Sequence, residues 1–150
     1  MLRIFALIAL MAVWLPVVQA QQPASPWSSD MASVWTDPAT GLMWTKKDNG
    51  LDVTWNQASA YCTNLRLVGN SGWRLPSIDE LAGIYDQTQN VDGRHIKGGI
   101  QITGWWGWSN SAGNASGEAW IFYFALGERG SFQLDFSTDS RALCVRRSGK

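Results

Sequence analysis

The stretch "SGWRLPSIDEL", Ser71 to Leu81, contains the start of a helix. Pro76 has no backbone N–H and holds the residue before it in an extended conformation, so the helix begins after it. Ser77 is predicted as the N-cap, and Glu80, three residues later, completes a capping box. The apolar residues that follow have helical spacing and give the helix one apolar face: Ile78, Leu81, Ala82 and Tyr85.

Trp73 and Arg74 come directly before this helix, and they could form either a binding site or part of the core. A tryptophan beside a buried turn is most often a core residue. Arg74 can pack its aliphatic stem or pair with the carboxylate of Asp79 or Glu80. We therefore expect a structural role for both residues, with ligand contact as the alternative.

The N terminus has the three parts of a secretory signal peptide. Arg3 precedes an apolar run, and Val18-Gln19-Ala20 ends in a small residue suited to cleavage. An uncleaved membrane anchor is the alternative, but the run is short for a membrane span and Pro16 interrupts it. We predict a signal peptide over residues 1–20, cut after Ala20, and a protein exported to the periplasm or the cell exterior.

The part after Ala20 is long enough for one domain with a substantial core. A flexible polar leader is predicted over residues 21–33 and a single domain over residues 34–147, with no membrane span. The chain has 12 Lys and Arg against 12 Asp and Glu, a formal net charge of zero. A general nucleic-acid binder needs a basic surface, so nucleic acid is not an expected partner.

The two cysteines, Cys62 and Cys144, would enter an oxidising compartment after export. This context favours one disulfide between them. The sequence has one histidine and no CxxC pair, so these cysteines do not predict a metal site. No metal ion or cofactor is expected.

Two segments before the capped helix predict a hairpin and another helix. "VWTDPATGLMW", Val34 to Trp44, has Asp37 and Pro38 for a type I turn and Gly41 for a permissive backbone position. "TWNQASAYCTNL" then predicts a helix whose inner face includes Cys62, because its larger apolar residues recur at intervals of three and four: Trp55, Ala58, Cys62 and Leu65.

A Gly-rich stretch without periodicity, residues 87–104, separates the two helices from the C-terminal part. The runs "WGWSNS", "AWIFYFAL", "SFQLDF" and "ALCVRR" predict three or four antiparallel strands, with a hairpin turn at Gly127 to Gly130. Helices grouped before an antiparallel sheet indicate an α+β fold. The disulfide would then join the first of the two helices to the last strand.

Several of these motifs occur together, and in the same order, in one family. The chain resembles the C-terminal domain family of the Legionella collagen-like adhesin, the Lcl C-terminal domain, which is similar to C-type lectin-like folds. The resemblance covers about Val34 to Arg147 and implies a C-type lectin-like α+β domain. Its motifs are "DPATGLMW", "WNQASAYCTNL", "GWRLPSIDEL", "WGWSNS", "AWIFYF" and "CVRR".

The resemblance also implies an expected function, namely surface adhesion and the binding of sulfated glycosaminoglycans by a trimer. This chain has no Gly-X-Y repeat, so its oligomeric state is left open. The long loop lacks the Glu-Pro-Asn and Gln-Pro-Asp triplets with which C-type lectins hold calcium, so no calcium site is expected. His95 is the only histidine and has no Ser or Cys motif beside it, so we expect no enzyme activity.

Two clusters remain as candidate ligand contacts. "GRHIKGG" places Arg94, His95 and Lys97 together, and arginine and lysine can bind sulfate or carboxylate. A solvated loop is the alternative. In "GWWGWSN", strand alternation places Trp106 and Trp108 on one face and leaves Trp105 as a candidate platform for a sugar ring.

These observations predict a non-catalytic binding module for a polyanionic glycan, sulfated or carboxylated, or for another ligand of the cell envelope. The alternative is a structural or assembly component of the bacterial envelope that acts through contacts with an envelope protein.

Overall fold

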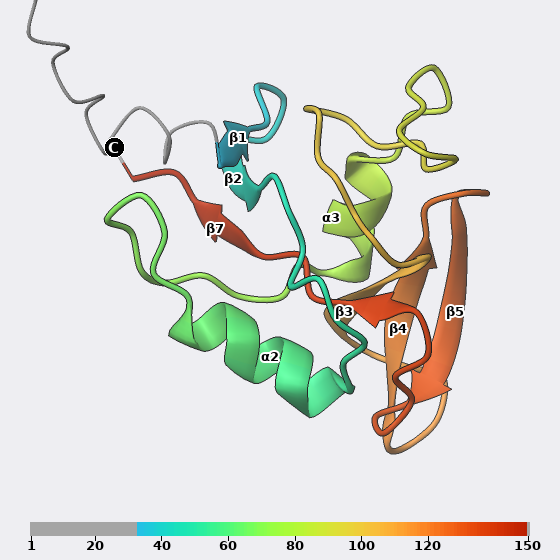
Figure 1. Ribbon diagram of the computed structural model, residues 1–150. Coiled ribbons are helices and arrows are strands. Elements are labelled where there is room, and N and C mark those ends of the chain that lie inside the picture. Colours follow the sequence, from blue (N-terminus) through green and yellow to red (C-terminus); the bar gives the residue numbers. More distant parts are fainter. Residues whose placement is uncertain (1–32, 150) are drawn as a thin grey trace, which may run out of the picture.

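The computed structural model describes residues 33–149. The predicted signal peptide and nearly all of the predicted leader lie outside the described residues. Two sheets, antiparallel except for one edge strand, and two helices make up the described part, which is mixed α+β as expected. Helix α3 lies in the middle of the molecule, between the small sheet and the larger one (Figure 1).

The first sheet joins the two ends of the domain. Strands β1 (Val34–Thr36) and β2 (Leu42–Thr45) form the predicted hairpin, and β7 (Val145–Arg147) pairs antiparallel with β2. In the turn, the Asp37 carboxylate accepts hydrogen bonds from the Ala39 backbone N–H at 3.1 Å and from the Thr40 hydroxyl at 2.7 Å. The first and last strands of the domain are therefore held in one sheet.

Helix α2 (Trp55–Asn64) confirms the first predicted helix. Thr54 is its N-cap and Gln57 completes a capping box. The prediction rested on apolar spacing and did not include this local signal. Ala58 and Cys62 lie on the inner face and are fully buried. Helix α2 therefore presents its cysteine to the core.

Helix α3 (Ile78–Gly83) begins at the predicted N-cap. The Ser77 hydroxyl accepts from the Glu80 backbone N–H at 3.1 Å, and the Glu80 carboxylate accepts from the Ser77 N–H at 2.8 Å. The helix is shorter than its apolar spacing indicates, because Tyr85 leaves it and forms a β-bridge with Ile96. The long loop is thus fixed against the end of α3.

The second sheet has the strand order β5-β4-β3-β6. Its antiparallel part is β3 (Trp106–Ala112), β4 (Glu118–Tyr123) and β5 (Glu128–Gln133), and β6 (Ser140–Arg141) lies parallel to β3. Helix α3 contacts both β3 and β4. The sheet and α3 are side by side in Figure 1.

Two details of the predicted meander are wrong. The last run, residues 142–147, adds no strand to this sheet, because its strand β7 joins the other sheet; the parallel edge strand β6 comes just before this run. The hairpin turn lies at residues 124–127, since Tyr123 pairs with Glu128. Gly130 is inside β5, where a Cβ atom would come within 2.5 Å of the Phe132 ring.

The disulfide is confirmed. Cys62 of α2 and Cys144 are bonded, their Cα atoms are 5.4 Å apart, and both residues are fully buried. Cys144 directly precedes β7 rather than lying within it. The bond ties α2 to the strand that closes the first sheet.

Candidate ligand-binding site

The motif at residues 73–77 is held by core contacts. Trp73 is 2% exposed, and its indole N–H donates to the Asn70 carbonyl at 3.2 Å. The backbone of Arg74 exchanges two hydrogen bonds of 2.9 Å with Val145 of β7. The carbonyl of Pro76, which is buried, accepts from the Asn110 N–H of β3 at 2.8 Å. These contacts place the motif between the two sheets.

The side chain of Arg74 pairs with Glu80. Its two terminal nitrogens each lie 2.7 Å from a Glu80 carboxylate oxygen, while Asp79 pairs instead with Arg129 at 2.9 Å. The hydrogen bonds from Arg74 lower the pKa of Glu80, and the same bonds raise the pKa of Arg74. This ion pair, together with the hydrogen bond from Arg74 to the Leu75 carbonyl at 3.0 Å, holds the start of α3 in place.

Arg94, the first basic residue predicted to contact a ligand, is engaged with its own loop. Its guanidinium donates to the carbonyls of Gly104 at 2.9 Å, Asp92 at 2.8 Å and Thr103 at 3.2 Å. It also lies 4.2 Å from the centre of the Trp105 ring. Trp105 is 37% exposed, with one ring face covered by this guanidinium.

His95 and Lys97 also bind backbone carbonyls. The Nδ1 of His95 lies 2.6 Å from the Gln89 carbonyl oxygen, and Lys97 Nζ donates to the Gly83 carbonyl at 2.8 Å. The structure therefore brings the three basic residues into one loop but uses their donors to hold that loop. Their role in ligand binding stays a prediction.

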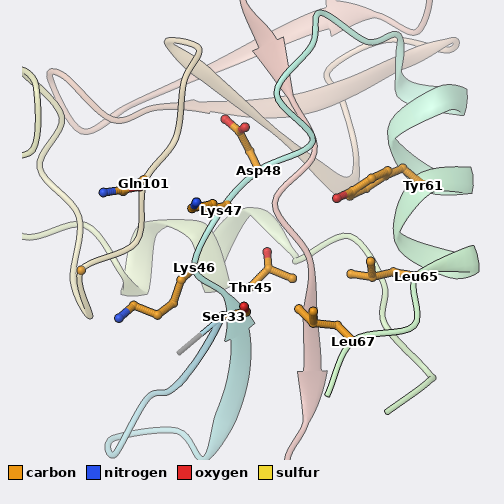
Figure 2. A pocket seen from close by; sticks show the side chains of 10 residues that line it. Ser33, Thr45, Lys46, Lys47, Asp48, Tyr61, Leu65, Leu67 and Gln101 are labelled. Atoms are coloured by element: carbon orange, nitrogen blue, oxygen red, sulfur yellow. The ribbon is translucent and has the colours of Figure 1, made fainter. Parts of the chain in front are cut away.

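A more open group of polar side chains lines a pocket of about 590 Å³, here called the lysine pocket (Figure 2). It lies where the chain leaves β2, beside α2 and the segment around residue 100. Its lining residues are Ser33, Thr45, Lys46, Lys47, Asp48, Tyr61, Leu65, Leu67, Gly99 and Gln101.

Backbone pairing holds the two lysines in place. The Lys46 N–H donates to the Ser33 carbonyl at 2.9 Å, and the Lys46 carbonyl accepts from the Gln101 N–H at 2.8 Å. Lys47 forms a parallel β-bridge with Gln101. Within residues 33–149, neither lysine ammonium has a hydrogen bond or an ion pair.

Asp48, the acidic residue of the lining, is used inside the protein. Its side chain is 1% exposed and accepts from the Gly50 N–H at 2.8 Å, from the Thr103 N–H, and from the Thr103 hydroxyl at 3.0 Å. Arg141 lies 3.9 Å away and pairs more closely with Asp52. The carboxylate of Asp48 is thus not presented to the pocket as a free partner for the lysines.

Tyr61 of α2 points its hydroxyl toward the pocket (Figure 2). Burial raises the pKa of this hydroxyl, and the negative charge of Asp48 raises it further. The Tyr61 hydroxyl is therefore protonated at neutral pH and can donate a hydrogen bond to an acceptor. Together with the two ammonium groups, it gives the lining of the lysine pocket three hydrogen-bond donors.

Sequence reasoning missed this site. The adjacent pair Lys46-Lys47 was its one local signal, but the lining comes from four separate segments of the chain. The pairing between Lys46 and Gln101 that joins two of them is not visible in any single motif.

The part of the chain that the structure describes has neither a metal-binding cluster nor a membrane-spanning helix. No three His, Cys, Asp or Glu side chains between residues 33 and 149 gather closely enough to hold a metal ion. No helix in the same part is long and apolar enough to cross a membrane.

Residues 33–149 thus form an α+β domain with one buried disulfide and a pocket lined by two lysines. The model of the Lcl C-terminal domain family matches residues 33–146, and the chain belongs to this family. Membership suggests a non-catalytic bacterial surface domain, and the disulfide agrees with export. A comparison with curated proteins gives no match.

Proposed function

We propose that this protein is an exported, non-catalytic binding module that takes an acidic glycan, carboxylated or sulfated, in the lysine pocket. The observation that carries the proposal is the pair of unpartnered ammonium groups beside a buried acid that is already satisfied. We also propose a C-type lectin-like arrangement for the fold and a periplasmic or cell-surface location.

An anion is the ligand that this chemistry favours. Lys46 and Lys47 supply two positive charges, and Tyr61 and Gln101 supply neutral donors on opposite sides of them. Lysine acts as a mobile point charge, so it tolerates either a carboxylate or a sulfate. Since charge–charge attraction in such an open site is screened over about 8 Å at physiological ionic strength, binding should weaken as salt is added.

The basic loop supports the pocket rather than competing with it. Arg94 holds the carbonyls of Thr103 and Gly104, and Lys97 anchors the segment to the end of α3. Gln101, which lines the pocket, lies in the chain between Lys97 and the Thr103 and Gly104 carbonyls that Arg94 holds. The loop predicted from sequence as the ligand site is therefore proposed to position one wall of it.

A pair of double variants with the same change in charge tests the location. Lys46→Gln with Lys47→Gln should weaken binding of an acidic oligosaccharide at low salt by at least about tenfold, because both charges leave the pocket. Arg94→Gln with Lys97→Gln has the same change in charge and should weaken binding less, by no more than about threefold in folded protein, because it loosens one wall of the pocket but leaves both ammonium groups in place.

Isothermal titration of both variants, with a melting curve for each, gives the answer. Loss of binding only in the Arg94 and Lys97 variant would place the ligand at the loop and contradict the lysine pocket. Failure of the wild-type protein to bind any acidic glycan at low salt would favour the envelope-assembly role instead.

A further inference from the structure

A second hollow adjoins the lysine pocket. It measures about 690 Å³ and shares Tyr61 and Leu65 with the first, so these two side chains form the boundary between them. Its lining residues are Asn49, Leu51, Val53, Gln57, Ala60, Tyr61, Asn64, Leu65 and Arg66. We call it the apolar hollow.

The lining of the apolar hollow includes large apolar side chains that are exposed to solvent. Leu51 is 70% exposed and Tyr61 is 38% exposed, and Val53 and Leu65 complete an apolar bed between them. Covering such side chains is favourable because apolar surface leaves water. Contact with these side chains would therefore stabilise a small apolar group of a bound ligand.

Asn64 is a polar residue of the apolar hollow whose side chain is free to pair with a ligand. Asn64, the last residue of α2, makes no side-chain hydrogen bond to any residue from 33 to 149. Asn49, by contrast, is committed, since its amide donates to the Leu51 carbonyl at 2.7 Å and accepts from the Ala142 N–H at 2.7 Å. Arg66 donates to the Leu65 carbonyl at 3.0 Å.

We infer that the two hollows together recognise an acidic sugar chain that carries acetamido groups. The acid lies against Lys46 and Lys47, and the acetamido group lies in the apolar hollow. Its methyl rests on Leu51, and its amide pairs with the side chain of Asn64. This inference rests on the proposed function, since the lysine pocket must hold the acid.

The chemistry of the apolar hollow favours this ligand over a glycan that bears only acids and hydroxyl groups. Hydroxyl groups prefer water to a bed of Leu51 and Val53, whereas an acetamido group has one apolar methyl and one amide. An amide also matches the donor and the acceptor of Asn64 at once. Each half of the group therefore has a partner on the protein.

Two matched probes test the inference. A short oligomer of N-acetylneuraminic acid carries a carboxylate and an acetamido group on every sugar. The matched oligomer of its deaminated form keeps each carboxylate and replaces each acetamido group by a hydroxyl. The wild-type protein should bind the first at least about fivefold more tightly, in line with burial of a methyl group and one added hydrogen bond.

A double variant shows where the preference arises. Leu51→Ser with Asn64→Ala should bring the two affinities to within about twofold, because it weakens binding of the acetamido oligomer more than binding of the deaminated one. Leu126→Ser is the matched control, because Leu126 is 61% exposed and lies outside both hollows. It should retain the full preference.

The outcomes separate this inference from the proposed function. Equal binding of the two oligomers by the wild-type protein, or a preference that survives Leu51→Ser with Asn64→Ala, would overturn the acetamido site alone. Binding of both oligomers that is unchanged by Lys46→Gln with Lys47→Gln would overturn the lysine pocket itself. Binding of neither oligomer at low salt would overturn the inference as well.

Discussion

Glu80 illustrates how much one side chain contributes at the residue scale. Its carboxylate accepts two hydrogen bonds from Arg74 and one from the Ser77 N–H, so it closes an ion pair and a helix cap together. The capping box was predictable because its two residues are three apart in the sequence. The Arg74 partner was narrowed to Asp79 or Glu80, and the structure selects Glu80.

Replacing Glu80 by Gln should reduce stability at neutral pH by about 1–2 kcal/mol, since Gln keeps the cap but loses the charged pair. Hydrogen bonds from Arg74 lower the pKa of Glu80 in the folded state. Its contribution is therefore complete above the unfolded pKa, near 4.5, and is lost as the pH falls through the folded value.

Chemical denaturation of both proteins between pH 7 and pH 3 measures this directly. The difference in unfolding free energy should be largest at neutral pH and should shrink below about pH 4. A difference that stays constant over this range would show that the charge of Glu80 does not matter.

At the scale of elements, the long loop depends on a close approach of its backbone to β1. Gly98 has φ +70°, and a Cβ atom there would lie 2.1 Å from the Trp35 ring. Gly99 has φ +65°, but its nearest neighbour would be the Lys46 side chain at 3.7 Å. The two adjacent glycines thus have the same backbone conformation, but only Gly98 lacks room for a Cβ atom.

Gly98→Ala should therefore destabilise the protein by more than 2 kcal/mol, because both strain and overlap with Trp35 oppose it. Gly99→Ala, which carries the strain alone, should cost about 1 kcal/mol. Thermal melting of the two variants checks this, and equal losses would mean that Trp35 does not pack on Gly98.

The elements themselves differed in how well the sequence predicted them. Both helices and the first hairpin rest on local signals, such as Ser77 and Asp37, and they were predicted correctly. The partner of β7 was not, because Val145 is joined to β2 and to Arg74 through contacts distant in sequence. The turn before β5 was misplaced because Gly130 serves ring packing rather than a bend.

At the scale of the whole molecule, the disulfide closes the domain. It joins positions 82 residues apart. A crosslink of this length should stabilise the fold by about 2–4 kcal/mol through the entropy of the unfolded chain. Cys62→Ala with Cys144→Ala should lower the unfolding free energy by that amount, measured in denaturant. A variant as stable as the wild type would show that the bond is dispensable for folding.

The lysine pocket is also a property of the whole molecule, which explains why no motif predicted it. Lys46, Tyr61 and Gln101 meet only after the small sheet, α2 and the long loop have packed together. The basic loop, by contrast, is a cluster in sequence, but its donors turn inward to carbonyls once the chain is folded. The sequence shows that the residues of this loop are basic, but it does not show that their donors are already bound to backbone carbonyls.

The most direct test of the lysine pocket is a titration of isotope-labelled protein with an acidic oligosaccharide, followed by amide chemical shifts. We predict that the largest shifts cluster at residues 45–48, at Tyr61 and Leu65, and at residues 99–101, and that added salt reverses them. Shifts confined to residues 93–97 and Trp105, with those three segments unchanged, would contradict it.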